Sequence, residues 1–586
     1  MKTIRNMRMV AGAASLSALA LAVHSSVLQA AQFEIGEVKG QFDSSLSIGA
    51  SWSMAAPDQK LVGALNGGKG NASVSDDGRL NFRKGDMISN IFKGVHDLQL
   101  SWGNSGVFIR GNYWYDFELK DGSRELYDID DSNRLTAAKA SGAQILDAFF
   151  YHNYSIGDYA GSGRVGRQVV SWGESTFIPN SINAINPVDL SALRRPGAEV
   201  KEALIPVNML FVSQTLSDSL SMEAFYQLDW SEVVVDNCGT FFSSSDLIAK
   251  GCDRAVIGGG GDLDPSTQLF IPRIGNRNPR NSGQFGVSLK WYAEQLNSTE
   301  FGLYAMNYHS RGPFLTAIGV DGTAPVPGNP GNAVSSRYFV DYPEDIRLYG
   351  FSFQTNIAAT GTSLSGEISY RPNMPLQISG NDLVSAAMVP LANRPTSANP
   401  LYLTGHAPLA GGEEITGYVR KPFTQAQVTA AHIFPRVLGA SRLMLLGEVG
   451  FSHIDKLGSA NGSDIRFGRD TVFGTGPLTN GSCAAPNKCT SDGFYTSNSW
   501  GYRVRSNLEY SNAFMGATLT PSIALSHDVS GYGPTFNEGS KAVSLGLGAS
   551  YKDTYSASID YTNFFGGDFN TSTDRDFLSV SFGINF

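Results

Sequence analysis

Two segments in the first third of the chain place charged and aromatic side chains at alternate positions, where they could contact a small molecule. Alternate residues of a β-strand share one face, and here the opposite face carries apolar residues such as Tyr113 and Val165. The residues on the polar face are Arg110, Trp114, Asp116, Arg164, Gln168, Trp172 and Glu174. They could form a charged constriction that selects a solute. Ordinary packing of a polar interior through salt bridges explains the pattern equally well, so both interpretations stay open.

The segment that follows, residues 186–206, mixes apolar residues with paired charges. Its charged positions include Arg194, Arg195, Glu199 and Glu202, and its apolar positions include Leu190, Leu193, Val200 and Leu204. A loop that faces only water has no need of these apolar side chains. We expect residues near 176–206 to fold inward as a constriction or plug, with Asp189 capping a short helix. Residues 372–409 have the same apolar character and could line an apolar path. A folded external cap is the alternative for both segments.

No pattern typical of an enzyme or a cofactor site is present. Neither G-x-S-x-G nor H-E-x-x-H occurs, although a Ser and a His on neighbouring strands could still catalyse hydrolysis. The run 128–132 begins like a calcium loop but lacks the central glycine and has Lys139 where the bidentate Glu belongs. Asp262 and Asp264, in a glycine-rich stretch, could bind calcium at the surface. We nevertheless expect no enzyme, no cofactor and no resident metal.

The elements that must position these residues are clearest at the end of the chain. The last segment is apolar at every second position, through Leu578, Val580, Phe582, Ile584 and Phe586. This alternation predicts a strand with one apolar face and one polar face. A last strand that closes on a terminal Phe resembles the sorting signal of outer-membrane barrels. We therefore expect the barrel assembly machinery to recognise Phe586.

The same alternation predicts about eighteen strands, with sixteen as the alternative because the segments near Val207 and Ile346 are weak. The predicted strands cover residues 42–52, 96–102, 107–119, 145–154, 164–170, 207–216, 220–230, 285–291, 301–308, 346–355, 364–370, 426–434, 443–451, 500–510, 517–525, 543–551, 555–561 and 578–586. Short and long connections alternate between them, which is typical of transmembrane barrels with short periplasmic turns and long extracellular loops. The predicted fold class is therefore all-β, a single antiparallel outer-membrane β-barrel over residues 31–586.

The first 30 residues have the pattern of a secretory signal peptide. Lys2, Arg5 and Arg8 precede an apolar stretch, and small residues around Ala30 offer a cleavage site. Removing residues 1–30 takes away three positive charges, so the formal net charge falls from -9 to -12. This acidity argues against nucleic acid as a partner. After residue 30 there is no run of about 18 apolar residues, so no helix is expected to cross a bilayer.

The four cysteines form two local pairs, Cys238 with Cys252 and Cys483 with Cys489, each inside a polar segment. We expect two loop disulfides, because disulfides persist in the periplasm and at cell surfaces. Free thiols are the alternative. A zinc site is disfavoured because no histidine lies near either pair.

Together these residues resemble the outer-membrane family known as domain of unknown function 1302, over nearly the whole chain after the signal peptide. The stretches that carry the resemblance are residues 42–47, 110–118, 164–175, 186–197, 238–242 and 370–378. Members of the family are often encoded beside RND-type exporters and a second uncharacterised protein. The resemblance therefore implies traffic of hydrophobic molecules, as an association and without a mechanism.

The expected function is a channel or transporter that passes a small, hydrophobic or amphipathic compound across the outer membrane. The alternatives are an outer-membrane component of an RND-associated envelope export system and a structural barrel with a closed lumen. The expected partners are outer-membrane lipid, the barrel assembly machinery and a small-molecule substrate. The export alternative adds periplasmic or inner-membrane transport proteins, and no nucleic acid is expected.

Overall fold

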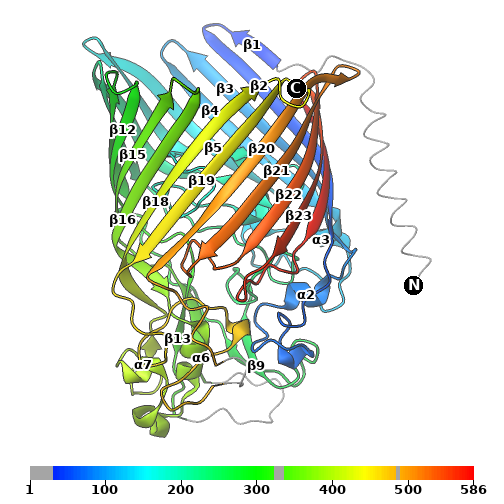
Figure 1. Ribbon diagram of the computed structural model, residues 1–586, viewed down its shortest axis with the longest axis vertical. Coiled ribbons are helices and arrows are strands. Elements are labelled where there is room, and N and C mark those ends of the chain that lie inside the picture. The colour runs from blue at the N-terminus through cyan, green and yellow to red at the C-terminus, as the bar shows by residue number, and fades with distance from the viewer. Residues whose placement is uncertain (1–30, 199, 323–334, 484–488) are drawn as a thin grey trace, which may run out of the picture.

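The computed structural model describes residues 31–198, 200–322, 335–483 and 489–586, so the predicted signal peptide and Glu199 lie outside the described residues. In this part of the chain, eighteen antiparallel strands form one closed barrel (Figure 1). The barrel strands are β2 (Val38–Ser53), β3 (Met87–Trp102), β4 (Ser105–Asp116), β5 (Ser141–Ile156), β6 (Tyr159–Gln168), β7 (Val207–Ser217), β8 (Leu220–Gln227), β11 (Phe285–Ala293), β12 (Thr299–Tyr308), β15 (Ile346–Ile357), β16 (Thr362–Gln377), β18 (Tyr418–Pro435), β19 (Arg442–Ile454), β20 (Asn498–Phe514), β21 (Ala517–Ser530), β22 (Lys541–Tyr551), β23 (Tyr555–Phe565) and β24 (Phe577–Asn585). Neighbours in this order pair, and β24 closes on β2. The prediction of eighteen strands is confirmed, and sixteen is wrong.

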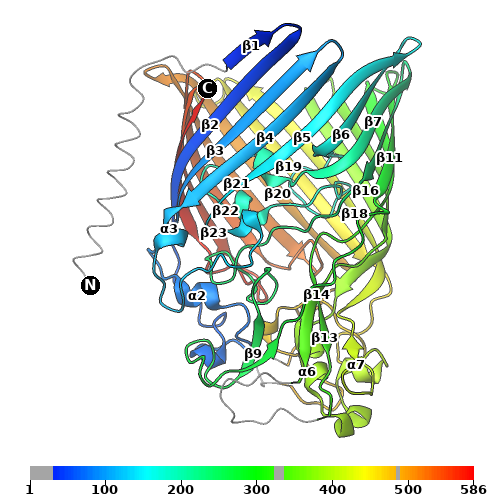
Figure 2. The same ribbon diagram turned by 180° about the vertical axis from the view of Figure 1, so that it is seen from behind.

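A short strand, β1 (Ala31–Ile35), precedes the barrel and is not predicted by the sequence pattern. It forms a hairpin with the beginning of β2, from Ala31↔Phe42 to Ile35↔Val38. Figure 2 shows this hairpin at the same end of the barrel as the C-terminus. Five residues are too few for a period of two to stand out, which is why the alternation does not reveal this strand.

The connections differ in length between the two ends of the barrel. Those at the end that holds the C-terminus are tight, such as 103–104 and 157–158, whereas the long loops gather at the opposite end (Figure 1). The loops carry η1 (Ala64–Asn66), α2 (Asp77–Asn81), α3 (Phe117–Asp121), η2 (Thr136–Ala138), α4 (Leu190–Leu193), α5 (Val200–Ala203), β9 (Arg254–Gly258), β10 (Leu269–Pro272), β13 (Phe314–Ile318), β14 (Arg337–Asp341), α6 (Gly380–Met388), η3 (Leu391–Thr396), α7 (Pro400–Leu403), β17 (Glu414–Ile415) and η4 (Thr471–Phe473). This asymmetry is the arrangement of an outer-membrane barrel, with its long loops extracellular.

The outward face of the barrel is apolar. Large hydrophobic side chains at alternate strand positions are exposed, among them Ile145, Val165, Leu210, Leu303, Ile368, Val449, Ile523, Leu545 and Ile559. A surface this rich in exposed aliphatic residues would be costly in water and is stable against lipid. Among the described residues, no helix is long and apolar enough to cross a membrane.

Residues 378–417 form a folded cap beyond the barrel mouth, where Figure 1 shows α6 and α7. Leu383, Ala386 and Leu401 are buried there with Ile415 and Phe467. Of the segment 372–409, residues 372–377 belong to β16, and the remaining residues lie in this external cap.

Both expected disulfides are present in the long loops. Cys238 pairs with Cys252 in the loop between β8 and β11, with 6.4 Å between their Cα atoms. Cys483 pairs with Cys489 in the loop between β19 and β20.

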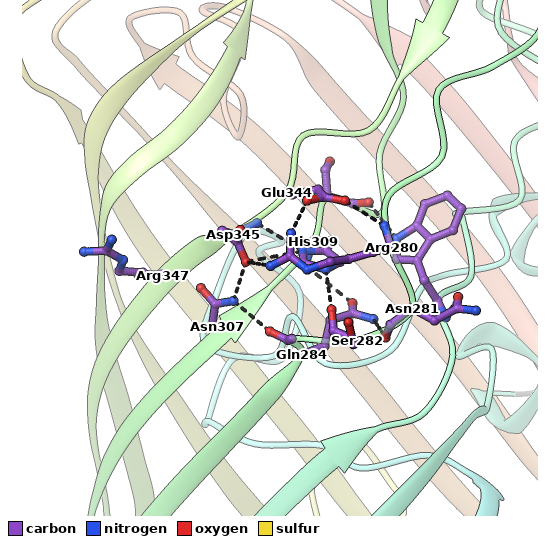
Figure 3. A network of polar contacts seen from close by, with 12 residues as sticks. Arg280, Asn281, Ser282, Gln284, Asn307, His309, Glu344, Asp345 and Arg347 are labelled. Atoms are coloured by element: carbon purple, nitrogen blue, oxygen red, sulfur yellow. Dashed lines mark hydrogen bonds and ion pairs between the residues drawn. The ribbon is translucent and has the colours of Figure 1, made fainter.

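A polar network ties the loop that follows β12 to the neighbouring strands (Figure 3). His309, which is fully buried, is bonded through Nε2 to the carbonyl oxygen of Ser282 at 2.9 Å, and its Nδ1 lies 3.0 Å from the backbone N–H of Asp345. This pairing suits a neutral ring in which Nε2 donates and Nδ1 accepts. The Arg280 guanidinium binds the carboxylates of both Glu344 and Asp345. The hydrogen bond from the Asp345 N–H therefore requires that His309 carries no proton on Nδ1.

We expect the folded barrel to lose stability as the pH falls below about 6.5, the pKa of an unperturbed histidine. Burial lowers the pKa of His309. The hydrogen bond to Ser282 opposes this effect, Arg280 adds to it, and the carboxylates of Glu344 and Asp345 oppose it. Because the unfolded chain then binds this proton more tightly, the contribution is complete above that pH and is lost below it. Urea unfolding at pH 7.5 and pH 5 measures the difference.

The pH dependence should become smaller in His309→Gln. It should stay unchanged in the control His152→Gln, whose histidine is exposed on β5. An equal pH dependence in the wild type and His309→Gln would contradict this assignment.

Candidate functional site

The loop between β6 and β7, residues 169–206, crosses the barrel lumen, and we call it the lumen loop. Its backbone binds inward side chains of β16, β18 and β19. In the order of the eighteen barrel strands, β19 lies eight places after β6. The loop therefore reaches the opposite wall and does not merely cover the barrel mouth.

Glu367, on the inner face of β16, binds three backbone N–H groups of the lumen loop. Its carboxylate accepts hydrogen bonds from Glu174 at 2.5 Å, Ser175 at 3.2 Å and Ile182 at 2.8 Å. The side chain is buried, 5% exposed, so water competes little for these bonds. Hydrogen bonds to a charged group contribute about 1.5–3 kcal/mol each, which makes Glu367 a strong anchor.

Glu448, on the inner face of β19, binds the next part of the loop in the same way. Its carboxylate accepts from the backbone N–H groups of Thr176, Phe177 and Ile178 at 2.7–2.9 Å. The residue is 1% exposed. Successive N–H groups pointing at one buried anion fix the local backbone path.

The tip of the lumen loop is held by two further contacts. Arg371 of β16 donates to the carbonyl oxygens of Asn180 at 3.0 Å and Ser181 at 2.6 Å. Asn180 in turn donates to the carbonyl oxygen of Pro534, in the loop between β21 and β22, at 3.2 Å. The part of the loop from residue 174 to residue 182 is thus fixed to the wall opposite its own strands.

An apolar core fills the side of the lumen next to β7, β8, β12 and β15. Trp172, Ile182 and Ile185 of the loop are each 2% exposed or less. They pack with the wall residues Val207, Met209, Phe211, Phe225, Tyr304, Met306, Tyr308, Ile346 and Leu348. The apolar residues of the loop therefore close this side to solutes.

A cavity of about 670 Å³ remains on the other side, between the lumen loop and the inner face of β20–β24. Its wall contains many small hydroxyl side chains, such as Ser526, Ser544 and Ser558. Four phenylalanines also line it, Phe177, Phe242, Phe564 and Phe577. The volume is in the usual range of small-molecule sites, about 300–1,000 Å³.

The charges around the cavity are strongly one-sided. Among the residues that the structure describes, six arginines line it, against the single carboxylate of Asp560. The arginines are Arg79, Arg194, Arg195, Arg503, Arg505 and Arg575. A narrow passage lined by arginine favours anions.

Three of these arginines are neutralised by carboxylates behind the cavity wall. Arg79 binds Asp574 in a two-pronged pair at 2.8 and 3.1 Å. Arg503 binds Asp528 at 2.6 Å, and Arg194 also forms an ion pair, with Asp236.

Of the other three arginines, Arg195 and Arg505 form no ion pair among the described residues, and Arg575 lies 3.8 Å from the Asp574 carboxylate that already binds Arg79. Arg505 has only a 3.4 Å contact with Asn507, and Arg195 lies over the Trp114 ring, 4.6 Å from its centroid. Arg575 is buried, and its Nη2 has no hydrogen-bond partner in the described part of the chain. Burial, with repulsion from Arg79, lowers the pKa of Arg575 to about 9. These groups supply the positive charge that a solute would meet.

The predicted residues of β4 and β6 face inward but do not line the cavity. Arg110 pairs with Asp97 at 2.7 Å, and Gln168 donates to the carbonyl oxygen of Met209 at 3.0 Å. The others are also engaged: Arg164 lies over Phe211, Trp172 packs in the apolar core, and Asp116 caps α3 and accepts from Ser89. These side chains thus make contacts within the barrel interior, and a charged constriction formed by them stays a prediction.

The predicted residues of the lumen loop divide between two roles. Arg194 and Arg195 line the cavity, whereas Glu202 forms a buried ion pair with Lys93 of β3 at 2.5 Å. Glu199 lies outside the described residues. Glu174 lies in the lumen, where burial raises its pKa to about 7.

The sequence patterns did not single out Glu367, Glu448, Arg503, Arg505 and Arg575. A signal for Arg503 and Arg505 exists, because they alternate with the outward Tyr502 and Val504 on a predicted strand. Glu367 and Glu448 are also at inward positions, but what they bind depends on where the lumen loop goes.

The fold and lumen loop define a closed outer-membrane-type β-barrel with a constricted interior. The family model described as "Protein of unknown function (DUF1302)" matches residues 11–586, so the chain belongs to this family. The resemblance seen in the sequence is thereby confirmed. Among individually curated proteins, no match to the chain is found.

Several solved structures are similar to this chain at low sequence identity. The OccAB1 protein of Acinetobacter baumannii has a TM-score of 0.41 and 11% identity, covering 95% of this chain and 98% of its own. The outer membrane protein OpdK of Pseudomonas aeruginosa has a TM-score of 0.39 and 8% identity, covering 93% and 98%. The A. baumannii outer membrane channel DcaP has a TM-score of 0.35 and 8% identity, covering 95% and 100%. Likeness at this level carries no inference about function.

Proposed function

We propose that this protein is an outer-membrane channel for a small, amphipathic anion, acting without catalysis. The observation that carries the proposal is the cavity between the lumen loop and β20–β24, with its six arginines and four phenylalanines. Arginine would bind the anionic group, and the phenylalanine rings would contact the apolar part of the solute. The sequence predicted a hydrophobic or amphipathic substrate. The arginines add the expectation that this substrate carries a negative charge.

The apolar outer surface and terminal strand support outer-membrane lipid as the surroundings of the barrel. Phe586 exchanges backbone hydrogen bonds with Ser44, at 2.6 and 2.9 Å, next to the β2–β24 closure. We propose that the barrel assembly machinery recognises this last strand during insertion.

An envelope export component is the second candidate, favoured by the β1–β2 hairpin. Phe33 and Ile35 of β1 are 37% and 70% exposed, and β2 is the only strand that pairs with β1 in the described part of the chain. An exposed edge strand at the end opposite the long loops could bind a periplasmic partner. This candidate predicts that the isolated barrel passes no ions until such a partner is added.

The proposal is tested by single-channel recording with Arg194→Ala and Arg195→Ala combined. The two guanidinium groups line the cavity, so their loss should widen the passage and weaken its positive field. We expect a conductance increase of at least about 20% and a lower preference for anions.

The matched control changes two exposed lysines outside the cavity, Lys84→Ala and Lys250→Ala. This control variant should leave the conductance and the preference for anions unchanged. Equal currents from the wild type and the double arginine variant would argue against a passage beside these residues.

A further inference from the structure

We propose that Asp76, Asp77 and Asp262, with Asp246 beside them, form a Ca²⁺ site that joins the extracellular loops. One carboxylate oxygen from each of Asp76, Asp77 and Asp262 lies within 4.8 Å of the others. Calcium binds oxygens at roughly 2.3–2.6 Å, so oxygens about 5 Å apart can share one ion. This site is separate from the cavity and from the proposed transport function.

In Asp76 and Asp77, neighbouring groups bind one carboxylate oxygen, and the second oxygen of each has no partner among the described residues. Oδ2 of Asp76 accepts from the Gly63 N–H at 2.8 Å and the Asn66 amide at 2.9 Å. Oδ2 of Asp77 accepts from the Tyr127 hydroxyl at 2.6 Å. Within the described residues, Oδ1 of Asp76 and Oδ1 of Asp77 are buried and accept no hydrogen bond. Asp76 is 0% exposed, so water does not reach these oxygens easily.

Gln268 provides an independent sign of a ligand. It is 5% exposed, and its amide nitrogen donates to Oδ1 of Asp262 at 3.2 Å. Its carbonyl oxygen has no hydrogen-bond partner in the described part of the chain. Because the two amide atoms share one carbon, this oxygen lies next to the acidic cluster. Carboxylates with an amide oxygen are the ligand set that calcium prefers.

No cationic side chain of the described residues pairs with the cluster. Arg79 is bonded to Asp574, and Arg254 to Asp253. A divalent cation would offset the mutual repulsion of these clustered carboxylates.

The ligands come from different loops. Asp76 and Asp77 lie between β2 and β3, whereas Asp246, Asp262 and Gln268 lie between β8 and β11. Tyr127, bonded to Asp77, adds the loop between β4 and β5. The second residue proposed from the sequence, Asp264, is not part of the cluster, because it is exposed and bonded to Ser266 and Thr267.

The test uses the full folded protein in detergent, with Tb³⁺ as a probe for the calcium site. Tyr127 is close enough to sensitise bound Tb³⁺ when excited near 280 nm. We expect a luminescence signal that Ca²⁺ displaces at millimolar concentration or below, as is usual for extracellular calcium modules. The thermal unfolding temperature should also be several degrees higher in CaCl2 than in EGTA.

The combined change Asp77→Asn and Asp262→Asn should remove both the luminescence and the calcium-dependent shift, whereas Asp264→Asn should keep both. Heat-modifiable gel mobility shows that each variant is folded. If the double variant does not fold, the wild-type comparison in CaCl2 and EGTA still decides. Wild-type protein with no Ca²⁺-displaceable signal and the same unfolding temperature in CaCl2 and EGTA would overturn the proposal.

Discussion

Changing Glu367 and Glu448 together to Gln is expected to at least double the single-channel conductance and to increase its fluctuations. The two carboxylates bind six backbone N–H groups of the lumen loop. A neutral amide keeps the size of the side chain but loses the charge, and its NH₂ group cannot accept a hydrogen bond. At about 1.5–3 kcal/mol for each bond to a charged group, losing even part of this set should release the loop from the wall.

The matched control is Glu509→Gln, an acidic residue of β20 that pairs with Arg442 away from the lumen loop. It should leave the current unchanged. A folded Glu367→Gln/Glu448→Gln barrel with wild-type conductance and noise would show that these anchors do not set the width of the passage.

Arg505→Glu is expected to lower the anion-to-cation permeability ratio at least threefold. Arg505 lines the cavity, is exposed and forms no ion pair among the described residues, so reversing its charge acts on the passage with little cost to folding. Fields in a narrow, low-dielectric passage are stronger than in open water. The shift in reversal potential across a KCl gradient measures the ratio.

Arg505→Gln should give an intermediate permeability ratio, because it changes the charge at this position by one unit. Arg505→Glu changes that charge by two units. Lys39→Glu is the control, since Lys39 lies exposed on β2 outside the cavity. A permeability ratio that moves equally in the Lys39 and Arg505 variants would place the selective field outside this cavity.

The barrel was predictable because its strands are repetitive. A lipid-facing strand needs an apolar residue at every second position, and each such position can be read without knowing the rest of the fold. The strand β1 was not predicted, because a segment of five residues is too short to show a period of two. An inward path of the lumen loop could be suspected because Leu190 and Leu193 are apolar side chains that a water-exposed loop does not need.

The candidate site was less predictable because it depends on contacts between distant segments. Arg194 was found, since an arginine pair stands out in the loop. Glu448 was not, because its partners Thr176–Ile178 are about 270 residues away in sequence. Asp262 was noticed, but Asp76 reaches it only when two loops fold together.

The most direct test of the transport account is the reversal potential of the wild-type protein in a planar bilayer under a KCl gradient. The account predicts steady openings whose reversal potential has the sign of an anion-selective passage. Openings selective for cations, or a silent bilayer from a barrel that is folded by gel mobility, would contradict it.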